Sequence, residues 1–389
     1  MIKLLFTIAA LVLTFGCGPN TEKTAPTVGP KAKPELFLYV TNVDNLRLRE
    51  KPNQSSEVIA QLKEGAVLEG AGNESTNQEL IELRGIPRRA PFYQVTAATG
   101  AKPMGWAFGG ALTCVYAGPR SGSPDAARIE QFAQFITTLN PKDLDSGAKA
   151  WHFVETDLAN ASQPLLDAAF VLLERFLERM KTEGEFYLLT EKQPFTADDG
   201  RDIFTDKFDH SKYPLTAKLY AAGFRMVMGE GTLFPVVNWG RFQEYFGPRT
   251  THTMQKYINQ RVAQQNTPMY DDGKLLIPLE KMADVAVFWE KFNRENPFFP
   301  LGEQARESER WLRLALIIGN DYAPVFSGDS SQVGQNYRSA WEYIQQVHPN
   351  TQLAQTAKEM AGLCAAEGWK RSQKVQDFIV KSVDAPVEE

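Results

Sequence analysis

The spacing of apolar residues changes once along this chain, and that change limits the folds open to it. In the segment 36–116 the apolar residues form short runs between turns, and residues 42–49 alternate apolar with polar side chains, as half-buried strands do. After Pro124 the apolar residues follow helical spacing, most clearly across 165–180. The sequence therefore predicts a multidomain β + α protein, in which a strand-rich region precedes an all-α region.

The strand-rich region contains many short strand candidates, and this is typical of a small β-barrel. Turn residues such as Pro52 and Gly65 separate the strands. A longer segment, 73–91, is expected to extend a loop or hairpin. The strand candidates are the segments 36–40, 42–49, 58–62, 66–69, 92–95 and 105–108.

The order of these residues resembles the bacterial SH3 domain (SH3b). The resemblance covers about a fifth of the chain and implies an SH3-like barrel over residues 36–117. The residues that carry it are Leu46-Arg47-Leu48-Arg49, Pro52, Val58-Ile59, Leu62-Lys63-Glu64-Gly65, Tyr93-Gln94-Val95, Gly105-Trp106-Ala107 and Leu112.

The closing strands of such a barrel flank a shallow groove, and this makes three residues candidates for binding a ligand. The exposed aromatic rings of Tyr93 and Trp106, together with Arg49, could hold a peptide or a glycan stem there. For Trp106, packing inside the barrel is the alternative.

A linker rich in Gly, Ser and Pro, residues 118–124, leads into an α-helical domain over 125–381 and a disordered tail over 382–389. Besides 165–180, the segments 218–228, 240–246 and 253–265 have helical patterns.

The helical domain contains an internal repeat of 52 residues. Trp289 and Trp341 each precede a proline by eight residues, and each proline precedes an alanine by eight. Because a helix tends to end before a proline, each unit predicts a helical hairpin. The repeat is similar to tetratricopeptide-type hairpins, with a longer period.

The first residues predict export. Lys3 precedes an apolar run over 4–15 that is too short to span a bilayer, and Cys17 follows it. This start resembles a bacterial lipoprotein signal over 1–17, and the resemblance implies a lipid on Cys17. An ordinary secretory signal that is cut nearby is the alternative. Residues 18–35 contain four prolines and few apolar side chains, so a disordered tether is expected.

Cys114 and Cys364 remain as a pair if Cys17 is lipidated. They could form a disulfide in an oxidising compartment, or both could be buried thiols. The net charge of −5 argues against a nucleic-acid partner.

No motif for catalysis, a metal or a cofactor is found. The four histidines are far apart, and the acidic stretch 198–210 does not match a calcium loop. Glu307-Ser308 resembles the Glu-Ser pair of lytic transglycosylases, but an amphipathic helix follows it instead of the rest of that motif. The sequence therefore predicts a protein that is not an enzyme.

Together these features resemble SH3b-containing lipoproteins with an uncharacterised helical domain, a likeness that implies no activity. We expect a non-catalytic lipoprotein of the cell envelope, whose barrel binds peptidoglycan or a peptide and whose helices form a scaffold for an envelope protein. A cell-wall hydrolase with an unrecognised active site and a purely structural assembly factor stay open as alternatives. Because Gly18 rather than Asp follows Cys17, the periplasmic face of the outer membrane is favoured if the source is Gram-negative.

Overall fold

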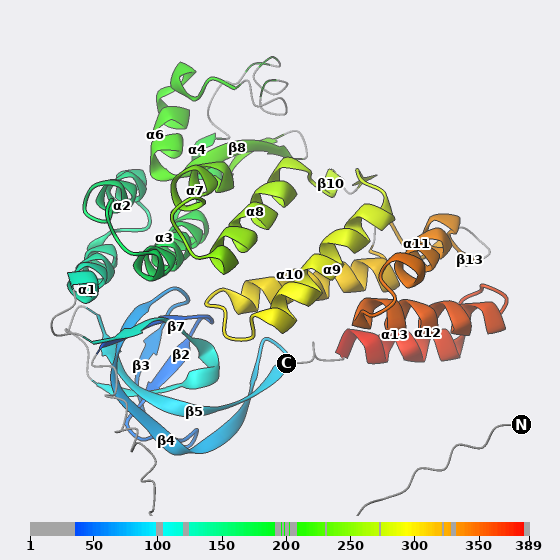
Figure 1. Cartoon of the computed structure of the whole chain (residues 1–389), viewed down its shortest axis with the longest axis horizontal. Coiled ribbons are helices and arrows are strands. Elements are labelled where there is room, and N and C mark those ends of the chain that lie inside the picture. The colour runs from blue at the N-terminus through cyan, green and yellow to red at the C-terminus, as the bar shows by residue number, and fades with distance from the viewer. Residues whose placement is uncertain are drawn as a thin grey trace, which may run out of the picture. The chain divides into compact units, whose positions relative to one another are not determined.

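Strands come first and helices follow in the computed structural model, as the apolar spacing predicts (Figure 1). It describes residues 36–98, 104–119, 124–190, 196, 198, 202, 208–229, 232–271, 274–320, 323–327 and 332–384. The expected signal, Cys17 and the tether 18–35 lie outside the described residues, as do most of the linker and the acidic stretch.

The first seven strands form one antiparallel sheet in the order β3-β2-β6-β5-β4-β1-β7. No ladder joins the edge strands β3 and β7 among the described residues, so the sheet is not closed. The strands are β1 (Leu36–Thr41), β2 (Leu46–Arg49), β3 (Val58–Leu62), β4 (Val67–Leu83), β5 (Ile86–Ala97), β6 (Gly105–Phe108) and β7 (Leu112–Gly118).

The segment 73–91 extends a hairpin rather than forming a loop. Strands β4 and β5 pair from Leu68↔Ala97 to Leu83↔Ile86, where the two residues Arg84 and Gly85 make the turn. The register shifts twice along β4, between Gly70 and Glu74 and between Glu74 and Gln78, and such irregularities allow a strand to bend. The curved hairpin is visible in Figure 1.

The helical region begins at Pro124. It contains α1 (Pro124–Thr138), α2 (Leu144–Thr156), α3 (Gln163–Gly184), α4 (Tyr187–Thr190), α6 (Pro214–Ala222), α7 (Trp239–Phe246), α8 (His252–Asn266), α9 (Leu279–Glu295), α10 (Gly302–Ile317), α11 (Gln335–Val347), α12 (Gln352–Ala366) and α13 (Gln373–Asp384). Helix α13 extends three residues beyond the expected domain end at 381.

The prediction of an all-α region is wrong, because two-stranded hairpins interrupt the helices. The expected helix 218–228 ends at Ala222, since Gly223 has φ 101° and a Cβ there would lie 2.2 Å from Nε1 of Trp151. The next residues form β8 (Phe224–Gly229) and β9 (Thr232–Val237). Two shorter hairpins are β10 (Tyr270–Asp271) with β11 (Lys274–Leu275), and β12 (Phe326–Ser327) with β13 (Gln332–Val333).

The sheet contributes residues to the apolar core of the helices and also encloses a smaller apolar cluster of its own. Alternate residues of β1 divide between two clusters: Leu36, Leu38 and Val40 pack with the helices, and Tyr39 packs inside the sheet. Helix α3 is mostly apolar over residues 165–177, and it contacts α1, α2 and β7. Both regions belong to one compact unit.

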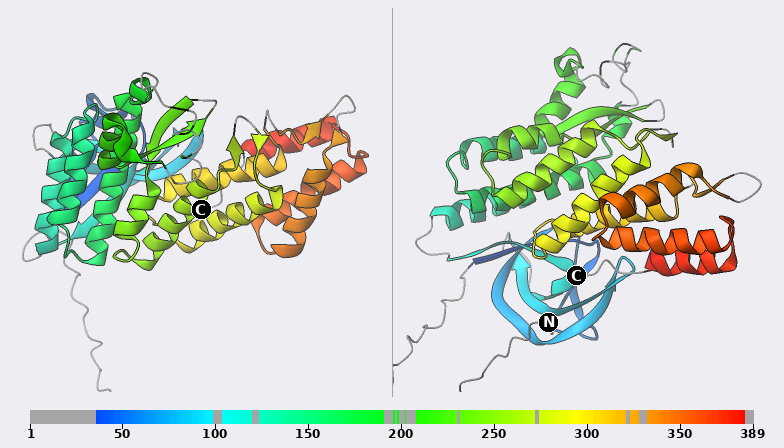
Figure 2. Two further views of the ribbon diagram at one scale, coloured as in Figure 1. Left: turned by 90° about the horizontal axis from the view of Figure 1, so that it is seen from above. Right: turned by 45° about the vertical axis from the view of Figure 1, so that its right-hand side comes forward.

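The two copies of the 52-residue repeat adopt the same arrangement. Helices α9 and α11 end just before Asn296-Pro297 and His348-Pro349, and α10 and α12 pack back on them. In both views of Figure 2, the yellow hairpin α9–α10 lies between the green α8 and the orange α11–α12.

Candidate functional site

The three residues expected to bind a ligand do not form one surface. Arg49 and Trp106 are cross-strand partners in β2 and β6, so their side chains share a face. Arg49 is buried, and its guanidinium donates to the carbonyl of Ser56 at 2.7 Å. Arg49 therefore holds the β2–β3 loop.

Tyr93 lies on the other face of the β5–β6 pair, because its cross-strand partner is Ala107 rather than Trp106. Its ring stacks on Tyr39 at 5.5 Å, and Tyr39 stacks on Phe37 at 6.2 Å. Tyr93 is thus one end of a half-buried aromatic stack, apart from Arg49.

The two cysteines lie in different parts of the fold. Cys114 is exposed on β7, and Cys364 is fully buried in α12. Both are free thiols in the described part of the chain.

A cleft of about 820 Å³ lies where the sheet meets the helices. We call it the charged cleft, because acidic and basic side chains make up most of its lining. The sheet contributes the segments 42–45 and 63–65 together with Arg84, and the helices contribute residues of α3, α8 and α10. Both charge signs in one cleft favour a ligand that carries both.

Gly65 allows the sheet to approach α3 here. Its φ is 75°, and a Cβ at this position would lie 2.6 Å from Cδ of Arg179. A side chain at residue 65 would therefore push the strand loop away from the helix.

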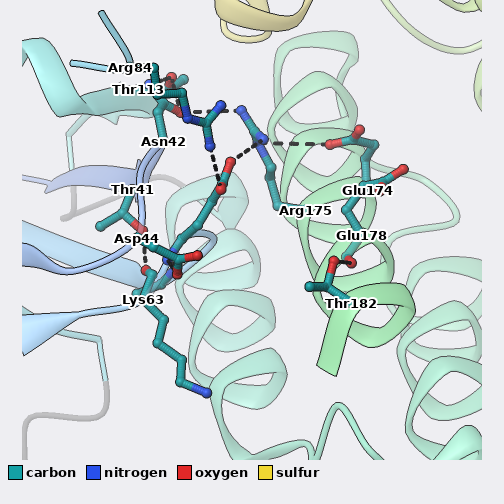
Figure 3. A network of polar contacts seen from close by, with 12 residues as sticks. Thr41, Asn42, Asp44, Lys63, Arg84, Thr113, Glu174, Arg175, Glu178 and Thr182 are labelled. Atoms are coloured by element: carbon teal, nitrogen blue, oxygen red, sulfur yellow. Dashed lines mark hydrogen bonds and ion pairs between the residues drawn. The ribbon is translucent and has the colours of Figure 1, made fainter. Parts of the chain in front are cut away.

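Arg175 joins the two regions across the cleft (Figure 3). Its Nη2 donates to Oδ1 of Asn42 at 3.2 Å, and its Nη1 lies 3.7 Å from Oε1 of Glu64. Glu64 in turn pairs with Nη2 of Arg84 at 2.6 Å, and Asn42 is hydrogen-bonded to Thr113. Because Arg175 is buried, these contacts fix its guanidinium in one orientation.

Glu174, next to Arg175 on α3, is the most unusual group in the cleft. It is only 2 % exposed, and burial raises its pKa to about 7 although Arg175 lowers it. Its Oε2 lies 3.9 Å from Nε of Arg175 and has no hydrogen bond within the described residues.

Other buried polar atoms of the cleft also have no hydrogen-bond partner among the described residues. They are Nε of Arg175, Nε of Arg261, Oε1 of Gln264 and Oε1 of Gln304. The guanidinium of Arg261 stacks over Trp239 at 4.6 Å, which orients it. Each unsatisfied buried group costs about 1–3 kcal/mol, so a ligand that pairs with them gains binding free energy.

Glu307, the acidic residue of the Glu-Ser pair, lies exposed on α10 and lines the same cleft. Ser308 donates its hydroxyl to the carbonyl of Gln304 at 2.8 Å, which is an ordinary contact inside a helix. One turn further along, Trp311 is 49 % exposed and offers an aromatic ring beside the cleft.

No group of three His, Cys, Asp or Glu side chains suited to a metal ion occurs within the described ranges. None of the helices there is both long and apolar enough to cross a membrane.

Comparison with protein-family models, with curated proteins and with solved structures found no match for this chain.

Sequence reasoning did not single out Glu174, Arg175 or Arg261. A signal for the first two was present: they stand together inside 165–177, where the other residues are mostly apolar. A charged pair within a helix that is apolar all round must be buried, and buried charges need partners. Arg261 gives no such signal, because α8 is polar over much of its surface.

Proposed function

We propose that this protein is a non-catalytic binding protein of the bacterial cell envelope. In this proposal a lipid on Cys17 anchors the chain, and the sheet is an SH3-like unit related to SH3b domains. The ligand is peptidoglycan or a peptide derived from it. The helical hairpins serve as a scaffold for an envelope protein.

The observation that supports binding is the charged cleft, in which buried polar atoms make no hydrogen bond within the described residues. Peptidoglycan stem peptides carry carboxylates and amino groups, so they match a cleft lined by both charge signs. The cleft replaces the predicted groove as the ligand site, because Arg49 is occupied by Ser56 and Tyr93 faces away from it.

Retention of the full chain on purified peptidoglycan tests the proposal. We expect retention that soluble stem peptides compete away and that Arg261→Gln weakens. Glu342→Gln, on the exposed face of α11, is the matched control and should change nothing. Absence of retention by the unmodified protein would rule out peptidoglycan as the ligand.

The anchor is tested separately. Cys17→Ala should release the protein from the membrane fraction into the soluble fraction. Unchanged fractionation of this variant would refute lipidation.

A second candidate function is hydrolysis of the cell wall. Glu174 favours it, because a carboxyl group with a pKa of about 7 beside a cleft can act as a general acid near neutral pH. Release of soluble muropeptides by the full chain, abolished in Glu174→Gln, would establish this function over simple binding.

A further inference from the structure

The buried polar atoms that make no hydrogen bond within the described residues of the charged cleft define the chemistry of its ligand. Three of them are acceptors: Oε2 of Glu174, Oε1 of Gln264 and Oε1 of Gln304. Two are donors, the Nε atoms of Arg175 and Arg261. A simple anion would satisfy only the arginines, and a simple cation only the acceptors. A group that carries a cation and an anion side by side satisfies both sets.

We infer that the charged cleft recognises the zwitterionic end of an amino acid, in which an ammonium and a carboxylate share one carbon atom. The ammonium donates to Glu174, and the carboxylate accepts from Arg261 and Arg175. This inference deepens the proposed function and rests on it, since it names the part of the ligand that the cleft holds.

Burial sets Glu174 and Arg175 apart from the other charged residues of the cleft. They are 2 % and 7 % exposed, respectively. The surrounding pairs, such as Lys63 with Glu183 at 3.0 Å, are partly exposed and already satisfied. Exposed pairs exchange readily with water and salt, whereas a buried group without a hydrogen bond gains more from a partner that the cleft admits.

The two arginines are held ready for a carboxylate. Arg175 is fixed by Asn42 and Glu64, which leaves its Nε on the side of Glu174. Arg261 is held over Trp239. Orientation before binding reduces the entropy lost when the ligand is immobilised.

Calorimetry on the full chain can test each half of the recognition. The probes are meso-diaminopimelate, which has a zwitterionic group at each end, its di-N-acetyl derivative and its diamide. We expect the free compound to bind at least about tenfold more tightly than either blocked compound. Equal affinities for the three compounds, or no binding of any, would overturn the inference.

Two variants show which residue binds the ammonium group and which binds the carboxylate group. Glu174→Gln should bring the free and N-acetylated compounds to the same affinity, and Arg261→Gln should do so for the free compound and the diamide. Glu342→Gln is the control and should keep both preferences. Circular dichroism of each variant checks that it is folded, and the comparison of probes on the unmodified protein does not depend on any variant.

A soluble stem peptide with one free zwitterionic end identifies the source of the ligand. Tighter binding of this peptide than of diaminopimelate would indicate a peptide ligand, and equal binding a free amino acid. Retention on peptidoglycan without any preference for free ends would leave the proposed function standing and overturn the inference. Binding of diaminopimelate without retention on peptidoglycan would leave the zwitterion recognition standing and overturn the proposed function.

Discussion

The hairpins α9–α10 and α11–α12 have the same internal frame and different outer surfaces. Trp289 and Trp341 are fully buried in the first helix of each pair, and Ala305 and Ala357 are fully buried in the second. Small residues in the second helix let paired helices approach closely, and the proline between the helices ends the first of them. These positions recur every 52 residues because the hairpin requires them.

Three positions of the second helix line a cleft or groove in each copy, and two of the three carry different residues. On α10 they line the charged cleft, and on α12 they line a groove of about 900 Å³ beside Phe378 of α13. The pairs are Glu303 and Gln355, Glu307 and Glu359, and Trp311 and Leu363. Buried positions therefore specify the hairpin, and the exposed positions between them give each copy its own surface.

Removing either buried tryptophan should have the largest effect on stability. Trp289→Ala and Trp341→Ala each leave a cavity in the core, and we expect a loss of about 3–5 kcal/mol in the free energy of unfolding, measured by urea denaturation. Phe298→Ala removes an aromatic ring that is 96 % exposed and should stay within about 0.5 kcal/mol. A small loss at only one tryptophan would show that the two frames are not equivalent.

Whereas substitutions in the hairpin core lower stability, we expect a substitution of Glu174 in the charged cleft to raise it. The raised pKa of Glu174 means that the folded state binds its proton more tightly than the unfolded state. The contribution of Glu174 to the free energy of unfolding is therefore fully present below pH 4.5, and it is lost as the pH rises to about 7. Glu174→Gln removes the ionisation, so we expect a gain of up to about 3 kcal/mol at pH 8.

Urea denaturation at pH 5 and at pH 8 checks this difference. The gain in Glu174→Gln should be small at pH 5, where the native carboxyl group of Glu174 is mostly protonated. The same gain at both pH values would contradict burial as the cause, and Glu342→Gln serves as the control.

A smaller effect should separate the two hairpins at the residue after each tryptophan. Glu290 accepts hydrogen bonds from the backbone N–H groups of Gln352 and Leu353 at 2.8 and 3.1 Å, so it caps the start of α12. Its counterpart Glu342 is exposed and accepts only from Gln346 in the contacts of the described residues. We expect Glu290→Ala to cost about 1–2 kcal/mol and Glu342→Ala under about 0.5 kcal/mol by urea denaturation. Equal losses would mean that the cap contributes nothing.

Much of this fold could be predicted from apolar spacing, because buried positions repeat with the period of the element that contains them. The strand-rich start and the helices at 240–246 and 253–265 follow from that spacing, whereas for 73–91 the sequence left a loop and a hairpin open. The hairpin β8–β9 was missed because 218–228 is mostly apolar and has no strong break in its pattern, and the helix ends where Gly223 packs against Trp151.

The site was harder to predict, because it depends on contacts between residues far apart in the sequence. Arg175 meets Asn42 across 133 residues, and no local pattern indicates such a contact. Arg49, Tyr93 and Trp106 were chosen for residue type within a family resemblance. Pleating then placed Tyr93 on the opposite face from the other two.

The smallest expected change in stability is at Trp311, the exposed aromatic residue of α10. Its ring is 49 % exposed and makes an edge contact with Tyr270 at 5.6 Å, so Trp311→Leu should cost about 0.5 kcal/mol in urea denaturation. Leucine is the residue at the matching position of α12, so the variant gives α10 the side chain of its copy. Weaker retention on peptidoglycan with stability almost unchanged would place recognition on the exposed face of α10. A loss above about 2 kcal/mol would instead show that Trp311 belongs to the core. Residue 311 would then contribute to the fold of the hairpin rather than only to its surface.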